Sequence, residues 1–146
     1  MPAGSWSPDG SSFVFATGKY APMYVVDTDG RTPPRAIDTG FLMAMTPAWS
    51  PDGSRIAFEG SERLADEALG DPRVYKIHPD GTGLAQVSQG IGWAGGAKWS
   101  PDGRRLLYLV DVAPPVQDGQ PVEGYPSTVQ LVVAERSGAG WSHRVV

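Results

Sequence analysis

The side chains that could act as catalytic nucleophiles or bases are few in this sequence. Its 146 residues include two histidines, His78 and His143, and no cysteine. Acyl transfer by a serine or threonine hydroxyl needs a base such as histidine beside it. We expect His78 in a turn and His143 in the last strand, both at the surface, and no nucleophile-elbow or zinc-protease motif occurs. The sequence therefore predicts no catalytic residues and favours a non-enzymatic protein, without excluding an enzyme.

Metal ligation and phosphate binding have weaker candidates. Residues 27–30 (Asp-Thr-Asp-Gly) begin like a calcium loop, but the remaining oxygen ligands are missing. The acidic side chains within residues 66–71 could approach a cation, although acidic loop residues are usually just solvated. The glycine pairs within residues 81–83 and 138–140 lack the third glycine and the helix of a nucleotide-binding loop. We expect no metal and no cofactor.

Composition excludes several classes of partner. The net charge is −4 and no cluster of lysine and arginine occurs, so a nucleic-acid partner is not expected. No apolar run reaches the roughly 20 residues that a membrane-spanning helix needs. Hydrophobic residues make up 40% of the chain, and 19 glycines and 14 prolines separate short apolar runs. This pattern is typical of an all-β protein with many tight turns.

The elements that must position any site are repeated three times. The pentapeptide Trp-Ser-Pro-Asp-Gly occurs at residues 6–10, 49–53 and 99–103, and each copy is followed by a short apolar run. A second apolar run ends in Asp-Gly at residues 29–30 and 80–81. Pro, Asp and Gly in this order suit a type I hairpin turn with a left-handed glycine. Each repeat therefore predicts a four-stranded antiparallel meander.

These repeats resemble the WD-like repeats of TolB-type β-propellers, whose blades carry Trp-Ser-Pro-Asp-Gly. The resemblance covers nearly the whole chain and implies an all-β fold of three propeller blades. We expect the first blade over about 1–43, the second over about 44–93 and the third over about 94–146. The three Trp residues are expected to fill the space between neighbouring blades rather than to bind a ligand.

Three blades do not close a ring, and the resemblance implies about six. The two end blades would each leave an apolar face open to water. A second copy of the chain could complete the ring as a homodimer, or the remaining blades could belong to a longer chain. We favour the homodimer.

The variable loops offer the best candidates for binding. The connections at residues 40–46 and 90–96 are apolar, whereas the corresponding repeats of the resembling family are usually polar. Methionine and aromatic side chains suit an apolar ligand or a partner segment, because methionine adapts to irregular shapes. The alternative is that these side chains tuck under the long loops as a small core. The candidate binding residues are Phe41, Met43, Met45, Trp93, Lys98 and Tyr125.

The sequence thus predicts a propeller scaffold that binds a protein, a peptide or a small apolar ligand on its loop face. One alternative is a propeller hydrolase or lyase, or the propeller portion of a larger peptidase-like enzyme. Another is an excised or designed propeller fragment. A cytoplasmic location is expected if Met1 is the native start, and an extracytoplasmic one if a leader was removed.

Overall fold

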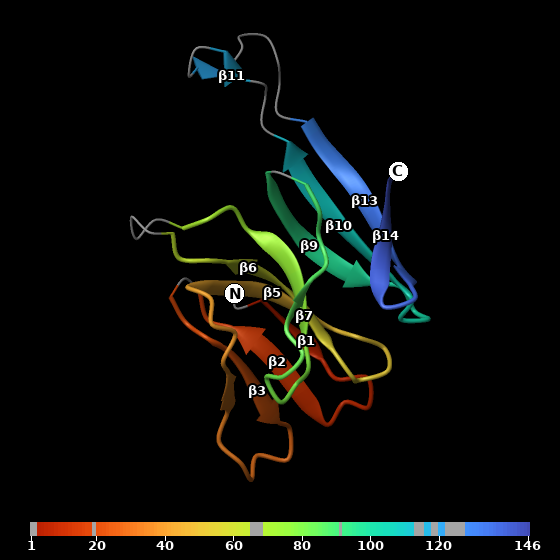
Figure 1. Cartoon of the computed structure of the whole chain (residues 1–146). Helices are drawn as coiled ribbons and strands as arrows, with labels where there is room; N and C mark the ends of the chain where they lie inside the picture. The colour runs from red at the N-terminus through yellow and green to blue at the C-terminus, as the bar shows by residue number, and fades with distance from the viewer. Residues whose placement is uncertain are drawn as a thin grey trace.

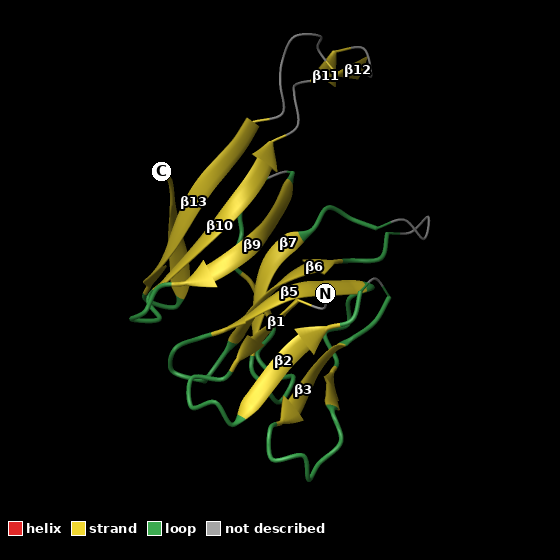
Figure 2. Ribbon diagram, turned by 180° about the vertical axis from the view of Figure 1, so that it is seen from behind, coloured by secondary structure: helices red, strands yellow, loops and turns green. Residues whose placement is uncertain are grey.

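The chain forms three four-stranded antiparallel sheets that lie side by side (Figures 1 and 2). The computed structural model describes residues 3–18, 20–64, 69–90, 92–112, 116–117, 120–121 and 128–146. The first blade contains β1 (Ala3–Trp6), β2 (Ser12–Ala16), β3 (Met23–Asp27) and β4 (Arg35–Ile37). The second contains β5 (Met43–Trp49), β6 (Ile56–Ser61), β7 (Arg73–Ile77) and β8 (Ala85–Gln86). The third contains β9 (Trp93–Trp99), β10 (Arg105–Val112), β13 (Thr128–Ser137) and β14 (Gly140–Val145).

The predicted Ser-Pro-Asp-Gly turns are confirmed in all three blades. The backbone N–H of Gly10, Gly53 and Gly103 donates to the serine carbonyl three residues earlier, at 2.9, 3.0 and 2.9 Å. These glycines have φ of +73°, +72° and +67°, the left-handed region that favours glycine. In each turn the serine hydroxyl donates to the aspartate, at 2.6, 2.6 and 2.5 Å. The repeated pentapeptide is therefore turn chemistry.

Two hydrophobic clusters hold the blades together, one at each seam between neighbours. We call the face of a blade that points towards the next blade in the chain its following face, and the face that points towards the blade before it its preceding face. Each seam joins the following face of one blade to the preceding face of the next. The first seam buries, among others, Val14, Ala16, Met23, Val25 and Ile37 of the first blade against Ala44, Ile56, Phe58, Tyr75 and Ile77 of the second. The second buries Ala57, Val74 and Val87 of the second blade against Ala94, Ala97, Leu106, Tyr108, Val110, Val132 and Ala134 of the third. The core therefore lies between blades, as burial of both faces of a sheet requires.

The tryptophans of the repeat lie at these seams. Trp49 packs against the first cluster and Trp99 against the second. The indole Nε1 of Trp99 donates to the carbonyl of Ala48 in the second blade, 3.1 Å away. Trp6, on which neither of the other two blades packs, is 60% exposed. The second and third repeats thus confirm the expected role of this residue.

The innermost strands begin earlier than the sequence indicates. Residues 43–46 and 93–96, expected in connections, already belong to β5 and β9. Both strands are interrupted by an irregularity of register at which Thr46 and Gly96 take positive φ, +48° and +66°. A bulge of this kind changes the direction of the strand. The sequence did not indicate these strand residues, because glycine and proline are uncommon inside strands.

The long loops hold more β structure than expected. The third carries a two-residue hairpin, β11 (Val116–Gln117) and β12 (Gln120–Pro121). In the second, Arg63 and Leu69 form an isolated antiparallel bridge. Residues 65–68 lie outside the described residues. Among the described residues, no helix is long and apolar enough to cross a membrane.

Candidate functional site

Each connection between blades lies beside the loop that follows the second strand of the blade before it. Leu42, in the first connection, accepts a hydrogen bond from Tyr20 at 3.1 Å and donates to Ser61 at 3.2 Å through backbone atoms. In the next blade, the Ala94 N–H donates to the carbonyl of Pro72 at 2.8 Å. We call these connections and loops together the loop end.

Phe41 lies inside the loop end. Its ring centroid is 4.4 Å from that of Tyr75 and 6.1 Å from that of Phe58. Gly60 provides the space, because a Cβ there would lie 2.7 Å from Phe41 Cδ2. These contacts match the alternative in which this residue belongs to a small core beneath the loops.

Met43, Met45 and Trp93 also lie at the loop end, where β5 and β9 begin, but on other blade faces than the one on which Phe41 packs. Met43 and Met45 stand opposite Ser61 and Glu59 in the β5–β6 ladder. Met43 is buried, whereas Met45 and Trp93 are half-buried. Both Trp93 and the Glu59 carboxylate approach Gly95, where a Cβ would lie 2.8 Å from Trp93 Cζ2. The structure therefore brings these three predicted residues together and separates them from Phe41.

Glu59 is the residue that our sequence analysis missed. Its side chain is only 6% exposed, and its Oε1 accepts the backbone N–H of Gly96 at 2.6 Å. A buried carboxylate is costly unless it is hydrogen bonded or paired with a cation. The sequence signal for this residue was a charge within the apolar run 56–60. Alignment of the repeats puts the apolar residues Ala16 and Leu109 at the position of Glu59.

The other two predicted binding residues lie elsewhere. Lys98 is exposed and stands opposite Leu107 on β9. Residues opposite each other in an antiparallel pair share a face, so Lys98 lies on the same face of the third blade as Leu107. Tyr125 lies outside the described residues.

The first blade carries an open aromatic face. Trp6, Phe13, Phe15 and Tyr24 follow one another with ring centroids 5.1, 6.5 and 5.6 Å apart. The register of β1, β2 and β3 pairs Trp6 with Phe13 and Phe15 with Tyr24, which places all four on one face. This is the preceding face of the first blade, and neither of the other two blades packs on it.

The same positions of the second blade are closed. Ile56, Phe58 and Tyr75 are 0%, 0% and 6% exposed and Trp49 packs beside them, because the first blade packs on this face. The aromatic face thus resembles one side of a seam on which no second blade of this chain packs.

The third blade carries an open aliphatic face. Leu107, Leu109 and Leu131 are 37%, 36% and 37% exposed, and Leu109 stands opposite Leu131. Alignment of the repeats puts Ala57 of the second blade, which is fully buried at a seam, at the position of Leu107. The three blades therefore leave two unlike faces uncovered.

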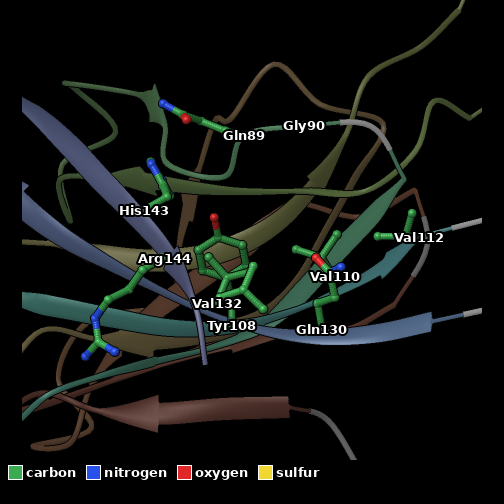
Figure 3. Close-up of a pocket in the computed structure, with 10 residues that line it drawn as sticks. Gln89, Gly90, Tyr108, Val110, Val112, Gln130, Val132, His143 and Arg144 are labelled. Carbon is green, nitrogen blue, oxygen red and sulfur yellow. The ribbon is translucent and has the colours of Figure 1, made fainter.

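A cavity of about 430 Å³ lies at the outer part of the second seam (Figure 3). Tyr108, Val110 and Val132 form its apolar floor, and His143 and Gln89 border it. His143 is therefore half-buried at a seam, not at the surface as expected, because its Nε2 bonds the Val87 carbonyl of the second blade at 2.8 Å.

His78 also departs from the surface position expected of it. It is half-buried, and its Nδ1 lies 2.8 Å from the Ser54 carbonyl. Within the described part of the chain, no three His, Asp or Glu side chains converge as metal ligands. Asp66 and Glu67, considered for a cation, fall outside that part.

Curated proteins share sequence with this chain, whereas no family model matches it. Dipeptidyl-peptidase 5 of Porphyromonas endodontalis is 29% identical over 119 residues, which cover 76% of this chain and 16% of that protein. The Tol-Pal system protein TolB of Alcanivorax borkumensis is 39% identical over 62 residues, covering 42% of this chain and 13% of that protein. The chain thus spans less than a fifth of either relative's length.

A solved structure, the putative TolB from Agrobacterium tumefaciens, matches nearly the whole chain. The TM-score is 0.70 at 20% identity, over 99% of this chain and 48% of that one. At such identity the likeness concerns the fold alone. This chain therefore has the TolB-like β-propeller fold, as three four-stranded blades.

Proposed function

We propose that this chain is a non-enzymatic propeller scaffold, completed to a six-bladed ring by a second copy of itself, that binds a partner at its loop end. The pair of unlike open faces carries this proposal. Each internal seam joins a following face to a preceding face. The third blade offers the first kind, uncovered, and the first blade offers the second.

The two open faces suit each other chemically. Aromatic rings on one side and leucines on the other would bury apolar surface at about 25 cal/mol per Å², the term that drives most association. Two copies related by a two-fold axis would form this contact twice and leave no blade face open. A single copy would keep both faces in water.

A substitution within the aliphatic face tests the ring. We expect the wild-type chain to show twice its single-chain mass by light scattering at micromolar concentration. Leu109→Glu puts a charge in the seam and should give the single-chain mass. Leu84→Glu, at a residue 42% exposed on the second blade and away from both open faces, is the matched control and should keep the double mass. A single-chain mass for the wild type would refute the ring.

The loop end is the proposed binding surface, with Met45 and Trp93 beside the Glu59 carboxylate. Half-buried thioether and indole groups next to one buried charge suit an apolar peptide segment that also offers a hydrogen-bond donor. Selection of a displayed random peptide library on the wild-type protein should enrich a sequence family that Trp93→Ala no longer retains. Equal retention by wild type and Trp93→Ala would count against this site.

The peptidase likeness favours a second candidate function, in which the chain is the propeller portion of a larger peptidase-like enzyme. The remaining blades would then come from the same polypeptide. A catalytic domain in the same reading frame, together with a single-chain mass, would favour it over the homodimer. Hydrolysis of esters, lactones or peptides by the 146-residue chain would instead support a hydrolase.

A further inference from the structure

At the place in the first seam that corresponds to the cavity of the outer second seam, aromatic rings contact one another. In the second blade, Tyr75 stands opposite Phe58 on the preceding face, and Phe41 packs on both. In the third blade, Val132 stands opposite Tyr108 at the same positions. A valine in place of a tyrosine leaves space for about one aromatic ring on the floor in Figure 3.

A second cavity, of about 390 Å³, adjoins the first and shares Gln89 and His143 with it. Its wall carries Lys76 of the second blade and Trp141 of the third. The Lys76 ammonium lies 5.7 Å from the centroid of the Trp141 ring. The two cavities together form one groove. One half has the apolar floor of Tyr108, Val110 and Val132, and the other half contains the Lys76 ammonium group.

The charges around Lys76 are all of one sign. Burial lowers the pKa of Lys76, and the neighbouring guanidinium groups of Arg55 and Arg136 lower it further. Among the described residues, no acidic side chain forms an ion pair with any of these three. In a chain with a net charge of −4, this local excess of positive charge favours an anion beside Lys76.

His143 adds a polar ring where the two cavities meet. Its Nε2 donates to the Val87 carbonyl, which can only accept, at 2.8 Å. Nδ1 is buried and has no hydrogen-bond partner. A buried polar atom without a partner is costly, and a hydrogen bond supplied by a ligand would remove that cost.

We infer that this groove binds an N-acylated aromatic amino acid with a free carboxylate, the chemistry also found at the C-terminus of a peptide. The aromatic ring lies over Tyr108 and Val132, the acylated N–H lies beside His143, and the carboxylate lies near Lys76. The groove is formed by the second and third blades of one chain, so this binding is independent of ring closure.

Titration with N-acetyl-L-phenylalanine, followed by the backbone amide resonances, tests the proposal. The shifts should centre on Gln89, Tyr108 and His143. N-acetyl-L-phenylalaninamide, which lacks the charge, should bind about tenfold more weakly. Acetyl-Ala-Ala-Phe with a free carboxylate distinguishes the sources: binding at least as tight as the single residue indicates a peptide C-terminus, and exclusion indicates a small acyl amino acid.

Two variants with matched controls separate the parts of the groove. Lys76→Met should bring the acid-to-amide ratio to about one, whereas Lys98→Met, at an exposed lysine, should keep it at about ten. Val132→Tyr restores the side chain of the second blade and should abolish binding of both probes, whereas Val129→Tyr, at an exposed residue of the same strand, should not. If Val132→Tyr does not fold, the Lys76→Met ratio decides.

Three results would overturn the inference. One is equal affinity of the wild type for acid and amide. Another is undiminished binding by a folded Val132→Tyr protein. The third is the absence of shifts at Gln89, Tyr108 and His143 at millimolar probe.

Discussion

Replacing Phe41 by alanine decides whether this residue is part of the core or part of a binding surface. Full truncation of a buried phenylalanine costs about 3–5 kcal/mol. Phe41 is half-buried but keeps close ring contacts with Tyr75 and Phe58, so we expect Phe41→Ala to lower the free energy of unfolding by about 2–3 kcal/mol. Urea denaturation, with a slope of about 1–3 kcal/mol per molar for small proteins, should show a midpoint about 1–2 M lower. Leu84→Ala, at an exposed leucine, is the control and should change the free energy by less than about 0.5 kcal/mol.

The neighbouring glycine makes the test sharper. A Cβ on Gly60 would lie 2.7 Å from Phe41 Cδ2 and 3.0 Å from Tyr75 Cδ2, so Gly60→Ala should cost about 1–3 kcal/mol. In the Phe41→Ala background part of that clash is gone, and the same substitution should cost at least about 1 kcal/mol less. Strict additivity of the two substitutions, or a loss below about 0.5 kcal/mol for Phe41→Ala, would refute the core interpretation.

Three further substitutions test other parts of the account. Trp99→Phe removes the indole hydrogen bond to the Ala48 carbonyl across the second seam and should lower the free energy of unfolding by about 1–2 kcal/mol in urea melts. Thr46→Gly should raise it by about 1 kcal/mol, because it relieves a positive φ of 48° and removes a buried hydroxyl without a partner, as Gly96 does in the next blade. Serine and backbone hydrogen bonds hold the pKa of Asp9 at about 2, below its ordinary 3.8. Its carboxylate therefore stabilises the fold above about pH 4 and ceases to do so as the pH falls towards 2, so Asp9→Asn should flatten this part of the pH dependence of thermal melting.

The sequence was sufficient for the fold wherever turn chemistry repeats. A Pro-Asp-Gly turn needs only local residues, so three copies define three hairpins, and the apolar runs between them supply the remaining strands. The seams followed from the same repeat. Trp49 and Trp99 lie at seams because a blade precedes each of them.

The candidate site was less predictable because it depends on which face each residue takes. The irregularities at Thr46 and Gly96 extend the innermost strands into sequences that look like loops, and this separates Phe41 from Met45. The position of Glu59 at a seam follows from register, which a shift of one residue would reverse.

The outer groove depends on comparison between blades. Val132 is unremarkable in sequence and becomes informative only beside Tyr75, the residue at the same place in the second blade. No local sequence pattern indicates that an aromatic side chain is absent from this groove, because side chains of two blades enclose the space.

Cross-linking between the two open faces tests the central claim, completion of the ring by a second copy, most directly. The chain has no cysteine, so Phe13→Cys and Leu107→Cys chains each carry one thiol. Ile56, the residue aligned with Phe13, shares the first seam's cluster with Val14, the residue aligned with Leu107. Mixed and oxidised, the two variants should give a disulfide-linked pair, whereas each variant alone should give little. Failure of the mixture to cross-link beyond either variant alone would contradict the ring.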